Sequence, residues 1–342
     1  MLPHFLVPEN WLQLTAVDAH TAGEPLRVIT GGWPELPGDD ILAKRRYAQT
    51  HHDWLRAAVM WEPRGHADMY GCVLTEPVTP DGDLGVLFLH NAGFSTMCGH
   101  GIIGLTVVAL DTGLVDRPGP APVLKIDTPA GRVTATAQRE NGRARVVSFC
   151  NVPAFVYALD QQVDVPGLGR IRYDVAFGGA FYAFVQAAEV RVGLTPADFR
   201  QLIELGRRIK QIVKDSLPLR HPFAADLGFL YGVIFVGPPH DPAHHSRNVC
   251  VFADGEVDRC PTGTGVSARA ALHYARGELA LGEPFTVESI LGTTFTGEIV
   301  AVERFGPYTA VVPQITGAAY ITGLNRLLID PDDPLKHGFM LR

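Results

Sequence analysis

The sequence predicts a mixed α/β protein of two related halves, each with many short strands and one buried central helix. Segment Leu105–Leu110 is apolar on nearly every side and follows a glycine-rich turn, which is typical of a buried helix. A second glycine-rich turn, Thr262–Gly265, has the spacing of Cys98–Gly101 and also leads into a helical segment. The offset between positions 98 and 262 is 164 residues, about half of the 342-residue chain. Gly131 and Gly292 lie in similar segments with an offset of 161, so the chain resembles a duplicated unit.

The remaining elements follow from short apolar runs, turn residues and helical spacing. Before the first central helix we expect strands at Leu14–His20, Leu26–Thr30 and within Met69–Asn91. After it we expect antiparallel strands at Val123–Ile126, Arg132–Thr136 and Arg145–Phe149. Further strands are expected at Ile171–Ala176, Ala180–Gln186, Tyr231–Val236, Asn248–Phe252, Thr286–Val302 and Tyr308–Val312. Further helices are expected at Asp39–Trp54 and Pro196–Leu217. Residues 1–11 resemble a loose arm, Pro153–Asp164 a crossover between the halves, and Asp330–Pro334 an irregular tail. The pattern lacks the regular βαβα alternation of a doubly wound sheet.

Composition narrows the class of protein. Hydrophobic residues make up 46% of the chain and charged residues 19%, which is typical of a globular protein. The net charge of −7 and the lack of a basic run argue against a nucleic-acid surface. We expect no signal peptide and no membrane span. Five widely spaced cysteines without a CxxC pair indicate reduced thiols, and hence a cytoplasmic protein.

The thiol of Cys98 stands at the start of the first central helix. Unpaired backbone N–H groups and the positive end of the helix dipole favour a thiolate there, and any anion held beside it. A free cysteine with a pKa of roughly 8.5 can fall to about 3.5–7.5 in such a place. Two related halves would bring two helix N-termini to one cleft, where a small anion could bind. A buried structural cysteine is the alternative interpretation.

Two other kinds of site share parts of this pattern. Gly99–Gly104 matches GxGxxG, but a dinucleotide fold expects its glycines directly after a strand and within a βαβ unit. Here Asn91–Met97 intervenes, and antiparallel strands are expected afterwards. Cys98 and His100 alone are a weak zinc signal, because two further ligands are not nearby in the sequence.

Asp258 lies four residues before Thr262 and allows two interpretations. An aspartate before a turn commonly makes a local cap or Asx-turn. Alternatively, its carboxylate could face the cleft and bind a substrate ammonium, with Arg259 as a competing ion-pair partner. Cys260 is two residues from the helix start and could point elsewhere.

Taken together, these motifs resemble the proline racemase family, and the resemblance covers nearly the whole chain. MCGHG at Met97–Gly101 is intact, and DRCPTGTG at Asp258–Gly265 resembles the family's DRSPCGTG. HTAGEP at His20–Pro25 resembles the family's HTxGEP. Phe177–Gly179 and Arg247–Asn248 also fit the family.

The resemblance implies a diaminopimelate-epimerase-like fold, with two pseudosymmetric halves and the active site between them. Each half would be a β-barrel-like antiparallel sheet around a central helix. We expect the halves at residues 1–160 and 161–314, with the tail 315–342 packed back on the first half. It also implies a homodimer that takes a hydroxyproline-type imino acid, without a metal, pyridoxal phosphate or nicotinamide cofactor, and without a nucleic-acid or membrane partner.

The resemblance further implies roles for individual residues. Cys98 would be a catalytic base, and Asp258 would contact the substrate nitrogen. The substrate carboxylate would be held, largely through backbone N–H groups, by Gly99, His100, Gly263 and Thr264.

Thr262 is the departure from the family pattern, because racemases and epimerases have their second cysteine there. A threonine hydroxyl does not ionise usefully near neutral pH, whereas a thiol does. Threonine at this position is typical of the trans-3-hydroxy-L-proline dehydratases of the family. The expected activity is therefore cofactor-free dehydration to Δ1-pyrroline-2-carboxylate, with Thr262 orienting the substrate or protonating the departing hydroxyl. Cys260 keeps a racemase or 4-hydroxyproline 2-epimerase as the alternative, and a non-catalytic amino-acid-binding protein is the third reading.

Overall fold

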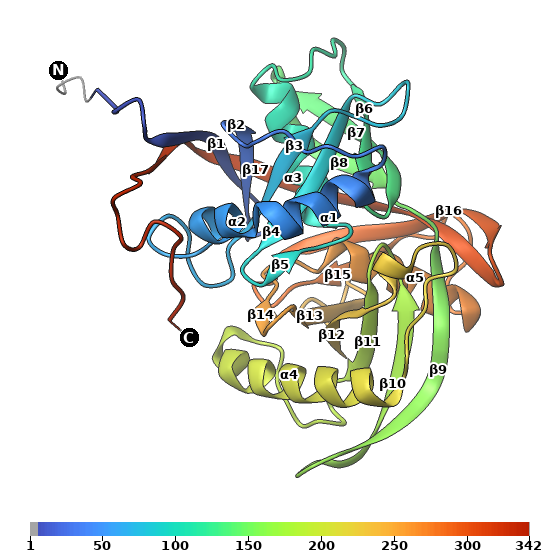
Figure 1. Cartoon of the computed structure of the whole chain (residues 1–342). Coiled ribbons are helices and arrows are strands. Elements are labelled where there is room, and N and C mark those ends of the chain that lie inside the picture. The colour runs from blue at the N-terminus through green and yellow to red at the C-terminus, as the bar shows by residue number, and fades with distance from the viewer. Residues whose placement is uncertain (1–5, 342) are drawn as a thin grey trace.

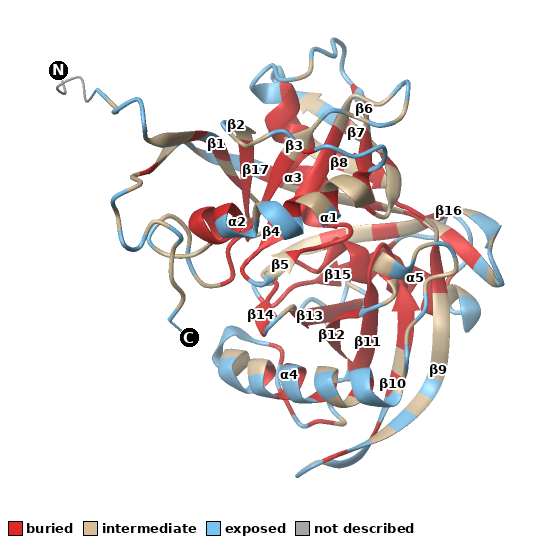
Figure 2. Cartoon of the chain, in the orientation of Figure 1, coloured by how far each residue is buried: buried red, intermediate tan, exposed pale blue. Residues whose placement is uncertain are grey.

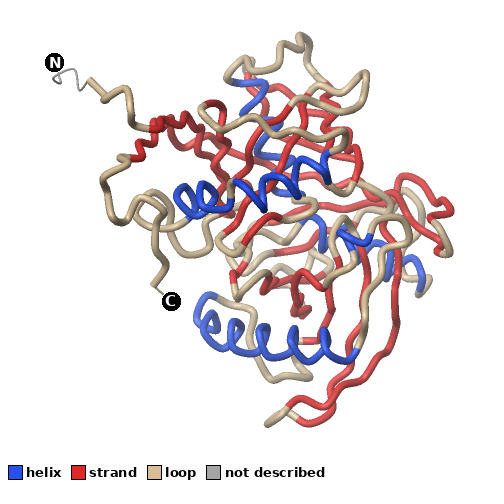
Figure 3. The backbone as a smooth tube through the Cα atoms, in the orientation of Figure 1, coloured by secondary structure: helices blue, strands red, loops and turns tan. Residues whose placement is uncertain are grey.

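Two closed rings of hydrogen-bonded strands, one above the other in Figure 1, make up most of the computed structural model, which describes residues 6–341. Strands predominate over helices throughout (Figure 3). The first ring consists of β1 (Leu12–Thr21), β2 (Glu24–Gly31), β3 (Tyr70–Thr75), β4 (Leu84–His90), β6 (Val123–Thr128), β7 (Gly131–Glu140), β8 (Arg143–Cys150) and part of β17 (Tyr308–Ile329). The short β5 (Gly93–Phe94) pairs with β4.

The second ring repeats this arrangement. It consists of β9 (Ala154–Val165), β10 (Gly169–Phe177), β11 (Phe181–Gln186), β12 (Leu230–Gly237), β13 (Ser246–Phe252), β15 (Phe285–Glu288), β16 (Thr294–Phe305) and the first part of β17. The short β14 (Glu256–Val257) pairs with β13 as β5 pairs with β4. Because β17 pairs with strands of both rings, it joins them.

One buried helix occupies the centre of each ring. In the first ring it is α3 (Gly99–Asp111), which packs against β8, β17 and β1; in the second it is α5 (Gly263–Ala275), which packs against β9, β17 and β10. Residues Gly99–Leu110 and Gly263–Leu272 are buried on all sides (Figure 2), as their apolar sequences predict. The expected fold class, two similar halves around central helices, is confirmed.

Pairing around the central helices differs in detail from the sequence expectation. Among the strands of residues 6–341, most pairs are antiparallel, but four pairs are parallel, namely β2–β3, β4–β6, β11–β12 and β13–β15. Each central helix thus connects two parallel strands, β4 to β6 or β13 to β15, and the chain crosses the ring interior between them. The same unit in both rings supports the duplication inferred from the glycine turns.

The other helices lie outside the rings. These are α1 (Ile41–His51), α2 (Asp53–Met60) and α4 (Phe199–Ser216), with 3₁₀ turns at Pro196–Asp198 and Ala225–Leu227. The expected single helix at Asp39–Trp54 is thus two helices that meet at His52. In α4, Leu202, Leu205, Ile209 and Val213 are buried at helical spacing, and the helix packs against β12 and β13. No helix within residues 6–341 is long and apolar enough to cross a membrane.

Some sequence expectations require comment. Pro153–Asp164, expected as a crossover between the halves, lies where the chain passes from the first ring to the second, but it forms a regular strand, β9. The middle of β9 lacks the alternation because it is partly exposed on both faces (Figure 2). β9 runs through the expected boundary at residue 160, and β17 runs through the one at 314. The division at these positions stays a prediction, although Ala319–Ile329 of the tail does pair with β1. Of the arm expected at 1–11, residues 1–5 lie outside the described residues, and 6–11 form no helix or strand.

Candidate active site

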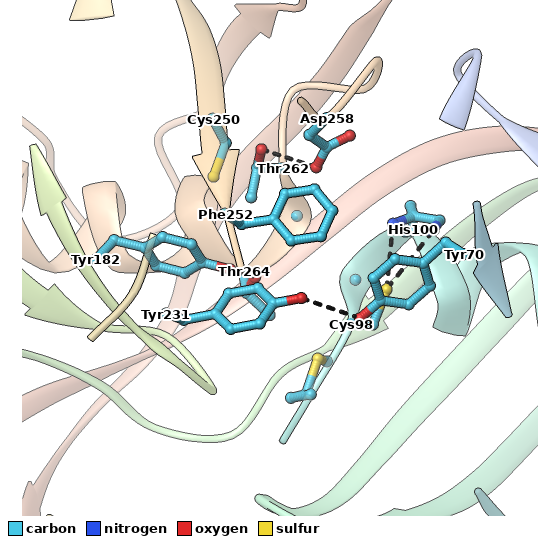
Figure 4. A pocket seen from close by; sticks show the side chains of 13 residues that line it. Tyr70, Cys98, His100, Tyr182, Tyr231, Cys250, Phe252, Asp258, Thr262 and Thr264 are labelled. Atoms are coloured by element: carbon cyan, nitrogen blue, oxygen red, sulfur yellow. Dashed lines mark hydrogen bonds between the residues drawn. The ribbon is translucent and has the colours of Figure 1, made fainter. Parts of the chain in front are cut away.

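A small pocket lies where the N-termini of α3 and α5 meet (Figure 4). Both rings contribute to its walls. The lining residues are Tyr70, Met97, Cys98, Gly99, His100, Tyr182, Tyr231, Cys250, Phe252, Asp258, Thr262, Gly263 and Thr264. All seven site residues singled out from the sequence are among them, although they come from segments about half the chain apart.

Gly99 and Gly263 bring the two helix N-termini into contact. A Cβ atom on Gly99 would lie 2.7 Å from Cα of Gly263, and one on Gly263 would lie 2.8 Å from Cα of Gly99. Only glycine fits at either position without a shift of backbone. The glycines therefore serve the close approach of the two helices. Backbone N–H groups of both helices converge on this point, which suits a small anion.

The Cys98 thiol caps α3. Its backbone is extended, with φ −145° and ψ 110°, and Sγ accepts a hydrogen bond from Gly101 N–H at 3.2 Å. Burial raises the pKa of this thiol well above its ordinary value, while hydrogen bonds from Gly101 and Tyr70 lower that pKa and the charge of Asp258 raises it. The stabilisation expected at a helix start is thus present, but burial outweighs it.

His100 is a neutral neighbour of this thiol. Its Nδ1 atom lies 3.1 Å from Cys98 Sγ. Burial lowers the pKa of His100 to about 4, although Asp258 and a hydrogen bond to the Pro25 carbonyl oppose that effect. A neutral imidazole can donate through one nitrogen and accept through the other. One ring nitrogen of the neutral His100 can therefore accept the hydrogen of the Cys98 thiol and orient it.

Asp258 and Thr262 form a hydrogen-bonded turn before α5. Thr262 Oγ1 donates to one carboxylate oxygen of Asp258 at 2.9 Å, and Cys260 N–H donates to the other at 2.8 Å. Both residues are 5% exposed and line the pocket. The local cap considered for Asp258 therefore exists, and the same carboxylate also faces the pocket. Arg259 instead pairs with Asp68 at 3.0 Å.

Thr262 differs from Cys98 in conformation as well as in chemistry. Its φ of 68° and ψ of 90° are uncommon for a β-branched residue, and such strain is typical of functional sites. Its side chain does not cap α5, because it turns to Asp258. Cys98 and Thr262 thus occupy equivalent positions in the two glycine turns, but Cys98 caps its helix and Thr262 instead bonds to Asp258.

The His20–Pro25 motif ties the two glycine turns together. Thr21 Oγ1 donates to the His100 carbonyl at 2.9 Å, and Glu24 accepts from Arg259 N–H at 2.7 Å. Glu24 is fully buried next to Asp258, and burial together with the charge of Asp258 raises the pKa of Glu24 well above its ordinary value. Glu24 and Asp258 therefore lie together in one buried cluster, which links the His20–Pro25 motif to the second glycine turn.

Sequence reasoning missed the aromatic wall of the pocket. Tyr70, Tyr182, Tyr231 and Phe252 line it from strands of both rings. Tyr182 OH lies 2.6 Å from Thr264 Oγ1, and Tyr70 OH lies 3.5 Å from Tyr231 OH. The sequence places Tyr231 and Phe252 in expected strands, but no periodicity tells which strand face will meet a pocket completed by the other ring.

A second missed residue is Cys250, which lines the pocket beside Thr262. Cys260 is fully buried behind the turn, and its Sγ accepts Thr262 N–H at 3.3 Å. Burial raises the pKa of both thiols well above the ordinary value. Neither of them caps a helix N-terminus as Cys98 does.

Within residues 6–341, one group of side chains has spacing that could suit a metal ion. The ligand atoms of His100, Asp258 and Cys260 all lie within 4.8 Å of one another. Nitrogen, oxygen and sulfur donors of this kind suit zinc. The Asp258 carboxylate and the Cys260 sulfur already accept hydrogen bonds from backbone N–H groups within the turn.

Comparison with known proteins agrees with this architecture. The proline racemase family model matches residues 16–340. The chain belongs to the proline racemase family. It is 47% identical to a trans-3-hydroxy-L-proline dehydratase of Colwellia psychrerythraea, across 98% of this chain and 94% of that one. It is 43% identical to a proline racemase of Clostridioides difficile, across 96% and 98%. A hydroxyproline epimerase structure from Agrobacterium vitis with bound trans-4-hydroxy-L-proline has a TM-score of 0.93 and 31% identity, covering 98% and 96%.

Membership of the proline racemase family accounts for the two rings and for the three motifs. These relatives are named as a dehydratase, a racemase and an epimerase, and each name concerns proline or a hydroxyproline.

Proposed function

We propose that this chain is a trans-3-hydroxy-L-proline dehydratase that forms Δ1-pyrroline-2-carboxylate and water without a cofactor. The observation that carries the proposal is the pair of residues at the two helix starts. Cys98 offers a thiol to the pocket, whereas Thr262 offers a hydroxyl whose hydrogen is already donated to Asp258. One face of the substrate thus meets a base, and the other meets a group with no proton to exchange.

The substrate carboxylate would bind between the two helix N-termini. Backbone N–H groups at Gly99, His100, Gly263 and Thr264 supply the donors, and the two helix dipoles favour the negative charge. As the Cα proton leaves, charge builds on the carboxylate. Donors already fixed in place stabilise that charge without reorganisation.

The ring ammonium would lie against Asp258. Its carboxylate is held by the Thr262 hydroxyl and by Cys260 N–H, and it lines the pocket in which the ammonium would bind. Asp258 and Glu24 are among the groups that raise the pKa of Cys98. A bound ammonium would offset the charge of Asp258 and lower that pKa, so substrate binding itself would promote the thiolate.

Stereochemistry makes a single thiol sufficient. In trans-3-hydroxy-L-proline the carboxylate and the 3-hydroxyl are on opposite faces of the ring, so the Cα hydrogen and the hydroxyl share a face. Cys98 would take the Cα proton, the C–H electron pair would form the C2–C3 double bond, and the C3–O bond would break to give water. The resulting enamine tautomerises to the imine. Racemisation, in contrast, needs a proton donor on the opposite face.

Thr262 would act through Asp258 in this scheme. Its hydroxyl hydrogen is engaged by Oδ2 at 2.9 Å, which fixes the carboxylate for the ammonium. We therefore assign Thr262 an orienting role, and not that of an acid.

A proline racemase or hydroxyproline epimerase is the second candidate, and Cys250 is the observation that favours it. This thiol lines the pocket next to Thr262 and could supply a proton from that side. The Clostridioides difficile racemase and the Agrobacterium vitis epimerase are relatives with such names. The relative of higher identity is named a dehydratase, which supports the first candidate.

One assay separates these candidates. The protein is incubated with trans-3-hydroxy-L-proline, and pyrroline carboxylate is measured. Its formation supports the dehydratase. Deuterium uptake with inversion in L-proline or 4-hydroxyproline, without pyrroline carboxylate, supports the racemase or epimerase, and the absence of both reactions leaves an amino-acid-binding protein.

A cytoplasmic location and a homodimer remain part of the proposal. All five cysteines are free thiols, which suits a reducing compartment. Sedimentation of the purified protein at several concentrations tests the dimer.

A further inference from the structure

Two phenol side chains meet across the pocket, one from each ring. Tyr70 begins β3 and Tyr231 lies in β12, and their hydroxyl oxygens are 3.5 Å apart (Figure 4). They are 2% and 6% exposed, and both line the pocket. Buried hydroxyls are normally hydrogen-bonded, so a pair that faces a ligand pocket is suited to bind a ligand hydroxyl.

The Tyr70 hydroxyl also has a hydrogen-bond partner, Ser95. Its oxygen lies 2.6 Å from Ser95 Oγ, and Ser95 is fully buried three residues before Cys98. When Ser95 donates to the phenol oxygen, the phenol hydrogen is free to point toward the pocket. Burial raises the pKa of Tyr70 well above its ordinary value, so the phenol keeps its proton at neutral pH.

The Tyr70 hydroxyl lies on the thiol side of the pocket. Its ring packs edge-on against His100, with ring centroids 4.7 Å apart, and His100 Nδ1 is 3.1 Å from Cys98 Sγ. A hydrogen bond from Tyr70 is also one of the two that lower the pKa of the Cys98 thiol. The Tyr70 hydroxyl and the Cys98 thiol are therefore neighbours on one side of the pocket.

We propose that Tyr70 is a further catalytic residue, which binds the 3-hydroxyl of the substrate together with Tyr231 and protonates it as it leaves. This inference rests on the proposed dehydration, in which the Cα hydrogen and the hydroxyl share a face. Tyr70 is the donor beside Cys98 on that face. The pair Tyr70–Tyr231 is then the determinant of selectivity for a hydroxyl at C3.

The proton balance closes within these residues. The Cys98 thiolate takes the Cα proton, and the C–H electron pair becomes the new C2–C3 bond. The C3–O bond breaks, and its oxygen takes the phenol proton of Tyr70 to form water. The Tyr70 phenolate then takes the proton from the Cys98 thiol, which restores both groups. A thiol is ordinarily more acidic than a phenol, so this return transfer is downhill.

Other donors near the pocket are less suitable. Thr262 donates its hydrogen to Asp258, and the pKa of about 4 shows that His100 is neutral, with an N–H directed at the Pro25 carbonyl. Direct return of the proton from the Cys98 thiol to the hydroxyl is the remaining route. In that route the Cys98 thiol itself protonates the departing hydroxyl, so the Tyr70 hydroxyl is not needed.

The test uses Tyr70→Phe, which keeps the ring and removes only the hydroxyl, and compares two reactions. The first is formation of pyrroline carboxylate from trans-3-hydroxy-L-proline. The second is exchange of the Cα hydrogen of L-proline in D₂O, which needs Cys98 but has no leaving group. We expect dehydration to fall by roughly 100-fold or more, as for loss of a general acid. Exchange should fall much less, because it loses only the hydrogen bond from Tyr70 that lowers the pKa of Cys98. Tyr231→Phe should raise KM for the hydroxylated substrate more than it lowers kcat.

Tyr182→Phe is the matched control, because its hydroxyl contacts Thr264 at the carboxylate end of the pocket. It should change dehydration and exchange by the same factor. Wild-type kcat for dehydration by Tyr70→Phe overturns the inference in favour of direct transfer from Cys98. Equal loss of both reactions in Tyr70→Phe also overturns it, because Tyr70 would then act only on the thiol. If the unmodified protein forms no pyrroline carboxylate, the proposed function itself has failed.

Discussion

Gly99 and Gly263 touch, with room for a Cβ atom on neither, and this contact sets the distance between the two helix starts. The side chains of Cys98 and Thr262 precede these glycines and therefore flank the same small space (Figure 4). Duplication alone gives two similar rings. The glycine contact turns them into one site, because it aims two sets of free N–H groups at a single point.

Gly99→Ala should separate the helix starts. The new methyl group would overlap Cα of Gly263, and overpacking of this kind costs about 1–3 kcal/mol. We expect a lower melting temperature, and a larger loss of activity than of stability, because the anion site is displaced. Gly323→Ala in β17 is the control, since its nearest atom is 3.6 Å away and its backbone is not left-handed. Equal behaviour of the two variants in thermal unfolding would contradict this account.

Cys98→Ser should abolish turnover and leave the fold intact. Serine can still accept the Gly101 N–H bond that caps α3, but an alcohol is a far weaker base than a thiolate. We expect kcat to fall by roughly 100-fold or more with an unchanged melting temperature. Cys150→Ser, whose thiol is outside the pocket, should keep full activity. Residual activity above a few per cent in Cys98→Ser would place the base elsewhere.

Asp258→Asn should weaken substrate binding by roughly 10- to 100-fold, the range of a hydrogen bond to a charged group. The amide can still accept one bond from the Cys260–Thr262 turn, so the fold should persist. Calorimetry with the substrate measures the effect. Asp254→Asn, on an exposed surface pair with Arg207, is the matched control. Unchanged affinity in Asp258→Asn would leave Asp258 with its local capping role alone.

The pH profile should report on the same carboxylate. Burial and the charge of Asp258 raise the pKa of Cys98, so the thiolate fraction, and with it kcat/KM, should increase as pH rises through and above neutrality. Removal of the charge in Asp258→Asn lowers that pKa and should move the rising limb to lower pH. The Asp254→Asn profile should match that of the unmodified protein. A wild-type kcat/KM that does not change with pH in this range would exclude Cys98 as the titrating base.

The pocket shows which features a sequence can predict. The motif residues were identifiable because the repeated spacing of the glycine turns pointed to a shared cleft, and because MCGHG and DRCPTGTG resemble the motifs of a known family. Tyr70 and Tyr231 could not be found in this way. Each is an ordinary strand aromatic, and only closure of two rings places their hydroxyls 3.5 Å apart.

The direction of the Cys98 pKa could not be inferred from the sequence either. The helix start lowers it, as expected, but full burial of the surroundings raises it by more. Likewise, the parallel pairing of β4 with β6 depends on α3 crossing inside the ring, which strand periodicity does not encode. Short sequence patterns thus predicted the helices, strands and motifs. The pKa of Cys98 instead depends on burial by residues that are distant in the sequence.

Thr262 is the residue on which the proposed reaction depends. A proton can be taken from one face of the substrate by Cys98, but Thr262 has no acidic hydrogen to return on the other, since its hydroxyl is bonded to Asp258. Elimination still proceeds, because the hydroxyl leaves from the adjacent carbon. We therefore expect negligible racemisation of L-proline by the unmodified protein, measured by chiral chromatography after incubation in D₂O. Rapid formation of D-proline would overturn the dehydratase and direct attention to Cys250 or Cys260.

Thr262→Cys should then introduce racemase or epimerase activity. The substitution places a second thiol at the start of α5, opposite Cys98, where a helix N-terminus favours the thiolate. Cysteine is not β-branched, so it should tolerate the φ of 68° at least as well as threonine does. Thr262→Ser is the control, because it keeps the hydroxyl bond to Asp258 and adds no thiol. We expect D-proline from the Thr262→Cys variant and none from the Thr262→Ser variant. Equal D-proline formation by the two variants would show that racemisation does not depend on a thiol at this position.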